Sequence, residues 1–252
     1  HMVMGARGGV GTGAQTLEDH MFKDALWSEA SDRLMGCYAQ DIADELNITR
    51  EDMDEYAIAS LTRAKNAIED GTLDDEVVPV TIKSRRGDKQ ITQDEQPMTA
   101  SLDKIPNLRP AFKKDGTVTA ANSSSISDGA SAMILMSESK ANELGCQPVA
   151  RILAHTRQSQ APSRFTLAPI GAMEKLLAKV GWTVDDVDLF EINEAFAMVP
   201  MAAIRKLGLD HAKVNVHGGA CAQGHPVGSS GSRIIITLMN ALKRQGKKRG
   251  VA

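Results

Sequence analysis

From residue 117 to residue 252, short apolar runs alternate with stretches of helical periodicity. The runs at 131–137 and 187–192 have the length of buried strands. Two other segments, 170–180 and 234–242, repeat apolar residues every three or four positions, as amphipathic helices do. This alternation is typical of βαβ units, in which a right-handed crossover joins two parallel strands. The sequence therefore predicts an α/β fold with a mainly parallel sheet.

Other segments of the same region extend this pattern. Three more strands are expected, at 117–122, 149–155 and 214–216. A helix from Glu194 to Leu207 should follow the second apolar run directly. Because ligands of open α/β sheets bind at the carboxyl ends of the strands, the start of that helix is a candidate site.

The N-terminal part of the chain predicts two helices and then an irregular region. A first helix is indicated by apolar residues that recur every four positions, namely Leu34, Tyr38, Ile42 and Leu46. Thr49 and Asp52 have the spacing of a capping box that opens a second helix, and Gly71 is expected to end it. Residues 72–118 are charged and interrupted by Pro and Gly, which favours irregular structure with short strands.

Composition excludes several classes of function. The net charge of −3 provides no field that favours nucleic acid or an anionic membrane, and no run approaches the roughly 18 apolar residues of a membrane span. Three widely spaced cysteines without a signal peptide fit a reducing compartment, so we expect a cytoplasmic protein of the bacterial cytosol. A removed organelle-targeting segment stays open as an alternative. The pair His1-Met2 is interpreted as a cloning remnant.

Two segments carry the polar residues that could perform chemistry. The first reads NEAFA, from Asn193 to Ala197, and the second is the Gly-rich turn at 218–231, which contains His225. Asn193 could equally be a helix cap, and His225 could equally be a structural histidine. His217, Cys221 and His225 are spaced by four, but glycines and a proline break the helix that this spacing would need, so no metal site is expected. Cys221 is interpreted as a buried, inert thiol.

Together these motifs resemble those of the thiolase family. NEAFA and the pattern GGAxAxGHPxGxSGxR at 218–233 are the most specific of them. LRPAF at 108–112 and GTVTAANSS at 116–124 are similar to the family's LRPAF and GTVTAGNAS. The resemblance covers essentially the whole chain after residue 2.

The resemblance implies roles for individual residues. In thiolases the GHP histidine donates to the thioester oxygen of an acyl-CoA, and the NEAF asparagine holds a water that completes this oxyanion hole. These roles pass to His225 and Asn193, and Ser124 is expected to approach the pantetheine arm of coenzyme A. Donors prearranged around a developing enolate are an effective source of catalysis. The remaining residues expected to bind substrate or coenzyme A are Met35, Phe165, Phe196 and Gly224.

The resemblance also implies an architecture. Thiolases have a layered α/β/α/β/α fold, which we expect to be incomplete here. Residues 1–118 would be the loop domain, 119–146 the tail of the N-terminal half, and 147–252 the C-terminal half without its last strands. The family is dimeric or tetrameric, so a homo-oligomer is expected, with coenzyme A thioesters as substrates and no further cofactor or metal.

Thiolase chemistry requires two cysteines. One carries the acyl group and the other moves a proton at the α-carbon. We expect the first to precede residue 3 and the second to follow Ala252, so that Cys37, Cys146 and Cys221 take neither role. The 252 residues alone are then expected to be inactive in Claisen condensation or thiolysis. A non-catalytic relative that binds acyl-CoA or lipid is the alternative.

Overall fold

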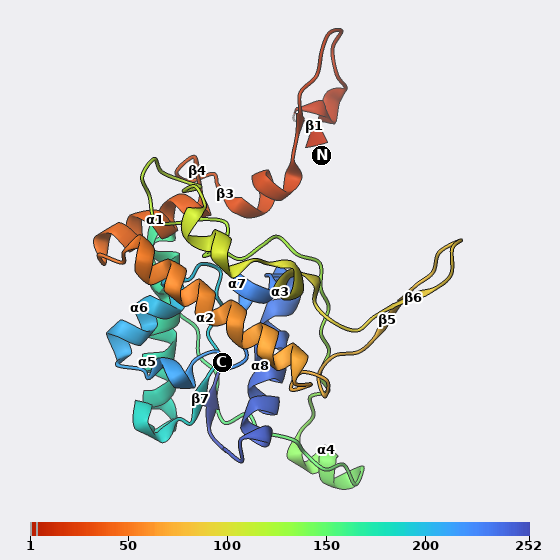
Figure 1. The fold of residues 1–252 in the computed structure, drawn as a ribbon, viewed down its shortest axis with the longest axis vertical. Coiled ribbons are helices and arrows are strands. Elements are labelled where there is room, and N and C mark those ends of the chain that lie inside the picture. The colour runs from red at the N-terminus through yellow and green to blue at the C-terminus, as the bar shows by residue number, and fades with distance from the viewer. Residues whose placement is uncertain (1, 4) are drawn as a thin grey trace.

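The computed structural model describes residues 2–3 and 5–252, so His1 of the predicted cloning remnant lies outside the described residues. Most of the molecule is a body of packed helices, from which an N-terminal arm and a β-hairpin project (Figure 1). The α-helices are α1 (Met35–Glu45), α2 (Arg50–Glu69), α3 (Glu95–Thr99), α4 (Glu138–Glu143), α5 (Ala168–Val180), α6 (Met198–Leu207), α7 (Ala220–Gln223) and α8 (Val227–Arg244). Short 3₁₀ segments include η3 (Leu102–Asn107) and η4 (Pro162–Leu167).

The strands are short and form four separate pairs. They are β1 (Met2–Val3), β2 (Leu17–Glu18), β3 (Trp27–Ser28), β4 (Arg33–Leu34), β5 (Val80–Ile82), β6 (Lys89–Ile91), β7 (Leu189–Phe190) and β8 (Gly250–Val251). The first three pairs, β1–β2, β3–β4 and β5–β6, are antiparallel, whereas β7 and β8 run parallel. Phe190 of β7 also forms a parallel bridge with Val214. Parallel pairing therefore lies at the centre of the helical body.

The predicted helices of the N-terminal part are confirmed. Helix α1 covers the apolar repeat, and α2 begins directly after Thr49. The Thr49 hydroxyl accepts from the Asp52 backbone N–H at 3.1 Å, and the Asp52 carboxylate accepts from the Thr49 N–H at 3.2 Å, which completes the capping box. Gly71, with φ of +73°, follows the helix end in the left-handed conformation that glycine adopts readily.

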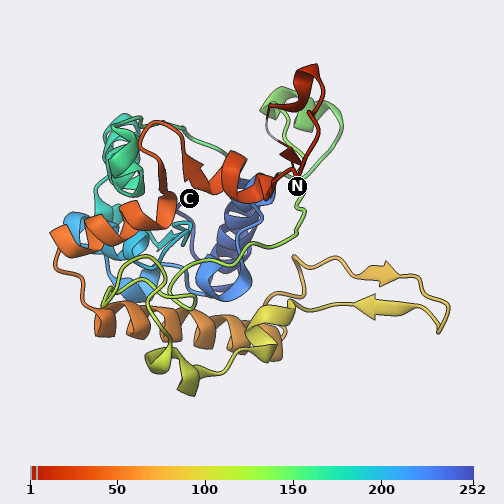
Figure 2. The ribbon, with the colours of Figure 1, turned by 90° about the horizontal axis from the view of Figure 1, so that it is seen from above.

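The core is built around the parallel pair. Phe190, Val214 and Val251 are almost fully buried and pack with Met53 of α2 and Met198 of α6 in one apolar cluster. Helices α5 and α6 pack together, and α8 lies against β7 and β8 (Figure 1). Helix α2 crosses the same body and reaches α7 and η3 (Figure 2). This packing brings the segments around residues 193 and 225 close to α2.

Three of the predicted strands are wrong as strands. Residues 131–137 and 149–155 have no regular secondary structure, and 117–122 contains bends but no ladder. A strand is maintained by a ladder of hydrogen bonds to a neighbour, and among the described residues 117–122 makes only isolated backbone bonds, such as Ala111 N to Val118 O at 2.9 Å. Ile134 and the adjacent Leu135 are 87% and 67% exposed, so both faces of this apolar run lack covering layers. Of the predicted strand Val187–Ile192, only Leu189 and Phe190 form a strand, which is β7. Of the predicted strand 214–216, only Val214 is paired, through its bridge to Phe190.

The predicted start of the helix after β7 is also wrong. Helix α6 begins at Met198, and Ala197 occupies the N-cap position, so Asn193 is not a helix cap. The backbone of 195–197 pairs instead with the turn at 122–124, where Ala197 N donates to Asn122 O at 2.8 Å and Ser124 N donates to Ala195 O at 3.0 Å. These bonds hold the NEAFA segment as a loop.

The irregular 72–118 region contains the short helices α3 and η3 and, before them, the β5–β6 hairpin. It extends away from the helical body in both views (Figures 1 and 2). Its apolar residues Val80 and Ile82 are exposed. None of the described helices combines the length and the hydropathy that crossing a bilayer requires.

Candidate active site

Asn193 and His225 are brought together from loops 32 residues apart. The carboxamide Nδ2 of Asn193 lies 3.3 Å from Nε2 of the His225 ring, and both side chains are half-buried. Asn193 follows β7 by three residues, and His225 precedes α8. Placement at the end of a parallel strand is what the sequence pattern predicted for this segment.

A turn at 122–127 holds the two loops in register. On one side it pairs with the NEAFA loop through an isolated antiparallel bridge between Ser123 and Phe196. On the other side the backbone N–H of His225 donates to the Ser125 carbonyl at 3.1 Å. Ser124 lies between these contacts, and its hydroxyl donates to the Ala195 carbonyl at 3.0 Å. The structure thus gathers Ser124, Asn193, Phe196 and His225 around one turn.

Gly224 is required by close packing in the same place. Its φ is +88°, and a Cβ at this position would lie 2.1 Å from the Ser127 hydroxyl oxygen. The backbone before His225 therefore approaches the 122–127 turn more closely than any side chain would permit.

Met35 and Phe165, the two remaining predicted site residues, belong to α1 and η4 and not to the turn at 122–127. Met35 opens α1, and the next residue, Gly36, packs under the ring of Phe112, which in turn contacts the Phe196 ring edge-on at 6.4 Å. This chain of contacts links the start of α1 to the NEAFA loop. Phe165, in η4, packs edge-on against Tyr38 of α1 at 6.4 Å. Its aromatic contact is therefore with α1 and not with the Phe112–Phe196 pair.

Glu194 anchors the NEAFA loop from the buried side, and the sequence interpretation assigned this residue no role. It is fully buried, and its carboxylate accepts from the hydroxyls of Tyr56 and Ser60 at 3.0 and 2.8 Å. The Asn215 amide donates to it at 2.8 Å and the Cys221 backbone N–H at 3.1 Å. Four donors from three segments converge on one carboxyl group, so Glu194 ties α2 to the NEAFA loop and to the Gly-rich turn. Sequence position alone does not predict this role, because the donors to Glu194 come from distant segments such as α2.

The electrostatics of the site come from burial and from Arg233. Burial lowers the pKa of His225, and the positive charge of Arg233 lowers it further, so the imidazole is neutral at neutral pH. Burial raises the pKa of Glu191 to about 8, against the opposing effect of Arg233. Both carboxyl oxygens of Glu191, and Nε and Nη2 of Arg233, are buried without hydrogen-bond partners among the described residues.

The three cysteines occupy unrelated environments. Cys146 is exposed, Cys37 is partly buried in α1, and Cys221 is buried in α7. The Cys221 thiol lies 3.7 Å from the Glu194 carbonyl oxygen, and burial raises its pKa well above the ordinary value. A protonated, buried thiol is a poor nucleophile. Within the described part of the chain, His225 has no hydrogen bond to any of these sulfur atoms.

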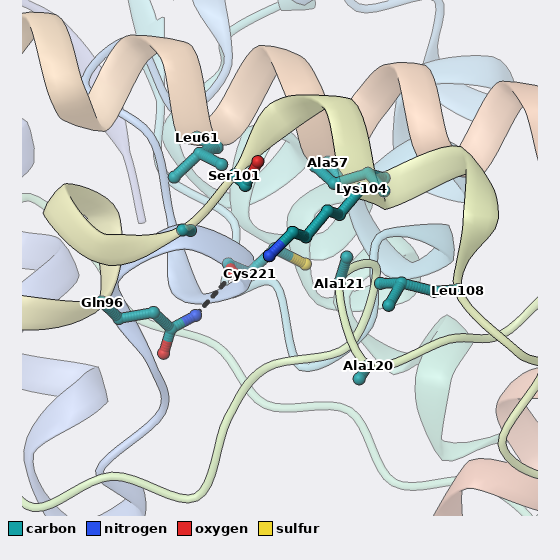
Figure 3. Close-up of a pocket in the computed structure, with 11 residues that line it drawn as sticks. Ala57, Leu61, Gln96, Ser101, Lys104, Leu108, Ala120, Ala121 and Cys221 are labelled. Carbon is teal, nitrogen blue, oxygen red and sulfur yellow. Dashed lines mark hydrogen bonds between the residues drawn. The ribbon is translucent and has the colours of Figure 1, made fainter.

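Cys221 also lines a cavity of about 240 Å³. The cavity lies between α2, η3 and the turn at Ala120 and Ala121, and Gln96 of α3 donates to the Cys221 carbonyl at 3.1 Å beside it (Figure 3). The cavity is lined mainly by small and aliphatic side chains, and Lys104 contributes an ammonium group to it. Neither Asn193 nor His225 contributes to this wall, so the cavity is distinct from the candidate active site.

Comparison with known proteins decides the family. The model of the thiolase N-terminal domain matches residues 1–139, and that of the thiolase C-terminal domain matches residues 146–252. The chain belongs to the thiolase family. Its α/β fold is accordingly thiolase-like, as the motifs predicted.

Individual thiolases agree with this assignment. The chain is 48% identical to an acetyl-CoA acetyltransferase of Yarrowia lipolytica over 92% of its own length and 58% of that protein's. The crystal structure of the Bacillus anthracis acetyl-CoA acetyltransferase superposes with a TM-score of 0.90 and 41% identity, over 97% of this chain and 62% of that one. A thiolase of Ascaris suum in complex with coenzyme A gives a TM-score of 0.88 and 40% identity, over 94% and 61%. The chain thus spans about three-fifths of the length of these thiolases.

Proposed function

We propose that this chain provides the oxyanion hole and part of the coenzyme A site of a thiolase. The reaction is Claisen condensation of two acyl-CoA molecules, or thiolysis of a 3-ketoacyl-CoA. The observation that carries the proposal is the contact of the Asn193 carboxamide with the His225 imidazole beside the Ser124 hydroxyl. Two nitrogen-bearing groups at the end of a parallel strand can polarise a carbonyl oxygen from one side.

Residue by residue, the proposal retains the expected roles. His225 and Asn193 would act on the thioester oxygen, and Ser124 and Gly224 would line the path of the pantetheine arm. Phe196 and Met35 would contact the acyl-CoA, and Phe112 lies between Phe196 and Gly36, the residue next to Met35. Phe165 is proposed to contact the acyl group because of its position in the sequence alone. Coenzyme A thioesters are the only small molecules that the proposal requires.

We also propose that residues 1–118 act as the loop domain over this site and that 147–252 act as the C-terminal half. The 252 residues alone are expected to bind acyl-CoA without turning it over. This follows because Cys221, the cysteine nearest to His225 in sequence, has a buried thiol directed at the Glu194 carbonyl. Assembly with further copies of the chain belongs to the same proposal.

Titration calorimetry with two ligands tests the function. Acetyl-CoA and free coenzyme A differ only in the acetyl group, which carries the thioester carbonyl and replaces the thiol hydrogen, so they form a matched pair. We expect the chain to bind both, and we expect His225→Ala to weaken acetyl-CoA by about 3- to 10-fold, the equivalent of one hydrogen bond, while coenzyme A is unaffected. Equal weakening of both ligands, or no binding of either at millimolar concentration, would contradict the proposed oxyanion hole.

The same samples separate the alternative function. A non-catalytic lipid-binding relative would bind a free fatty acid without coenzyme A, which the proposed site would not. Thiolysis is followed as loss of the ultraviolet absorbance of acetoacetyl-CoA in the presence of coenzyme A. No turnover is expected from the 252 residues, and measurable turnover would overturn the proposed inactivity while leaving the assignment of the site intact.

A further inference from the structure

Asn215 lies where the segment that pairs with β7 turns away from the strand. Its backbone N–H donates to the Phe190 carbonyl at 2.9 Å, beside the parallel bridge between Phe190 and Val214. Its φ of +48° is in the left-handed region, so the backbone leaves the ladder at this residue. Ile192 is two residues after Phe190 and faces the same side of the strand, and its N–H and C=O would be the next groups to pair.

The carboxamide of Asn215 binds both of these backbone groups. Its Oδ1 accepts from the Ile192 N–H at 2.8 Å, and its Nδ2 donates to the Ile192 carbonyl at 2.8 Å. The second hydrogen on Nδ2 goes to the Glu194 carboxylate at 2.8 Å. The reversed amide would direct its NH₂ group at an N–H and its oxygen at two acceptors, so one orientation alone satisfies these contacts. Asn215 is 1% exposed, which shields all three hydrogen bonds from water.

These contacts connect the two loops of the candidate site. Asn193 lies between the two residues that the Asn215 side chain binds, so its backbone is held on both sides. The backbone C=O of Asn215 accepts from the Gly218 N–H at 3.0 Å, which begins the Gly-rich turn that carries His225. One residue thus fixes both the point where the NEAFA loop leaves β7 and the point where the Gly-rich turn starts.

We propose that Asn215 is a positioning residue that sets the separation of Asn193 and His225. The inference rests on the proposed function and deepens it, because these are the two residues assigned to the thioester oxygen. Asn215 acts through backbone groups and makes no contact with substrate in this proposal. Displacement of a site group by about 1 Å is enough to weaken its contact with a reacting centre. Loss of the Asn215 carboxamide should therefore impair recognition of the thioester carbonyl more than binding of the rest of coenzyme A.

A second asparagine provides a matched control. Asn47 lies two residues after the end of α1, its φ is +50°, and its side chain is exposed. Substitution by glycine removes a carboxamide from the same backbone conformation at both positions, and glycine adopts that conformation without strain. Only Asn215→Gly removes the hydrogen bonds to the NEAFA loop.

The first measurement uses no ligand. Amide hydrogen exchange and the ring C–H signals of His225 are recorded by NMR, and the ring signals are assigned by their loss in His225→Gln. The Ile192 N–H should be protected in the wild-type chain and in Asn47→Gly, and it should exchange at least about 10-fold faster in Asn215→Gly. The His225 ring signals should move in Asn215→Gly and stay in place in Asn47→Gly, because only the former releases the loop beside the ring.

The second measurement is titration calorimetry with acetyl-CoA and free coenzyme A. We expect Asn215→Gly to weaken acetyl-CoA by about 3- to 10-fold while coenzyme A is unaffected, and Asn47→Gly to change neither. When Asn193 has already been replaced with alanine, adding Asn215→Gly should cause no further loss of acetyl-CoA affinity, because the carboxamide that it positions is absent. A residue that supported the fold alone would weaken both ligands alike in either background.

Several outcomes would overturn the inference. They are unprotected exchange of the Ile192 N–H in the wild-type chain, unmoved His225 ring signals in Asn215→Gly, and equal loss or no loss of the two ligands in that variant. The first is measured on the wild-type chain, so a variant that fails to fold does not remove the test. A wild-type chain that binds no acetyl-CoA, while exchange and ring signals behave as expected, would overturn the proposed function and leave the positioning role of Asn215 in place.

Discussion

Two buried glutamates, three residues apart, differ in how many hydrogen bonds their carboxyl groups accept. Glu194 accepts from four donors, whereas both oxygens of Glu191 are buried without a partner among the described residues. A buried charge with full hydrogen bonding stabilises the structure around it, and a buried carboxyl group without partners favours its neutral form. The two residues therefore predict opposite responses to the same substitution.

Replacing Glu194 with Gln should destabilise the chain. One carboxyl oxygen becomes an NH₂ group that faces existing donors, and the Cys221 backbone N–H cannot turn away as the hydroxyls of Tyr56 and Ser60 can. Loss of a charge-assisted hydrogen bond and the new donor–donor contact together cost about 2–4 kcal/mol. Urea unfolding at pH 7 measures this free energy. A change below about 0.5 kcal/mol would show that the cluster does not support the loop.

Glu191→Gln should instead remove a dependence of stability on pH. The pKa of Glu191 is raised to about 8 in the folded chain, compared with an ordinary value of 4.5, so between these values the unfolded state binds fewer protons than the folded state. The free energy of unfolding must then fall as pH rises from 4.5 to 8, with this group contributing at most about 1.4 kcal/mol per pH unit. Burial also raises the pKa of Glu76 and Asp94, and their similar contributions cancel in the comparison of variant and wild type.

The comparison requires unfolding curves of both chains at several pH values in that window. The wild-type curve should lose stability relative to Glu191→Gln as pH rises, and the two curves should run parallel above pH 8. Parallel curves throughout the window would mean that Glu191 ionises normally in the folded chain.

At the scale of elements, local patterns predicted helices well and strands poorly. Helices α1, α2, α5 and α8 follow from apolar spacing, from the Thr49 capping box and from terminating glycines such as Gly181, all of which act within a few residues. A strand depends on a partner elsewhere, and 131–137 has none among the described residues. The start of α6 was misplaced for the same reason, because the distant turn at 122–124 engages the backbone of the NEAFA loop.

Helix α1 offers a test of whether close side-chain packing outweighs the intrinsic helix propensity of alanine. Alanine normally stabilises a helix interior by about 0.5–1 kcal/mol relative to glycine. In Gly36→Ala, however, the new methyl group would lie 2.1 to 2.4 Å from the ring of Phe112, so overpacking of about 1–3 kcal/mol should outweigh that gain. Gly231→Ala in α8 is the control, because nothing lies within 4 Å of its Cβ position. Thermal unfolding should show a lower midpoint for Gly36→Ala and a higher one for Gly231→Ala; a stabilised Gly36→Ala would contradict the close contact.

The candidate site was only partly predictable from the sequence. Motif letters nominated Asn193, His225 and Ser124, and the structure brings these three together. Glu194, which holds the NEAFA loop, escaped notice because its contacts depend on partners such as Tyr56 that lie far away in the chain. Spacing reveals which residue types are available, but not which distant donors converge on them.

For the whole molecule, the unpaired apolar segments should govern behaviour in solution. Ile134 and Leu135 in one segment and Ile152 and Leu153 in the other are all more than half exposed. Extended backbone with unpaired N–H and C=O groups and apolar side chains on both faces is a template for association. We therefore expect the chain to self-associate as its concentration rises.

Sedimentation velocity over a hundredfold range of concentration measures this association. Ile134→Lys and Ile152→Lys should shift the distribution toward monomer, because a charge opposes edge pairing. Val80→Lys is the control, since Val80 is 60% exposed on a hairpin strand that is already paired through Ile91. A wild-type chain that stays monomeric at every concentration would refute the expectation, as would equal effects of the three substitutions.

The turn at 122–127 has a consequence for the order of events during folding. It binds a loop 71 residues further along the chain through Ser124, and Glu194 binds Tyr56 and Ser60 across 138 and 134 residues. Contacts of such sequence separation carry a large loop-closure entropy and form slowly compared with local helices. We therefore expect the contact between Asn193 and His225 to form after the local helices have formed.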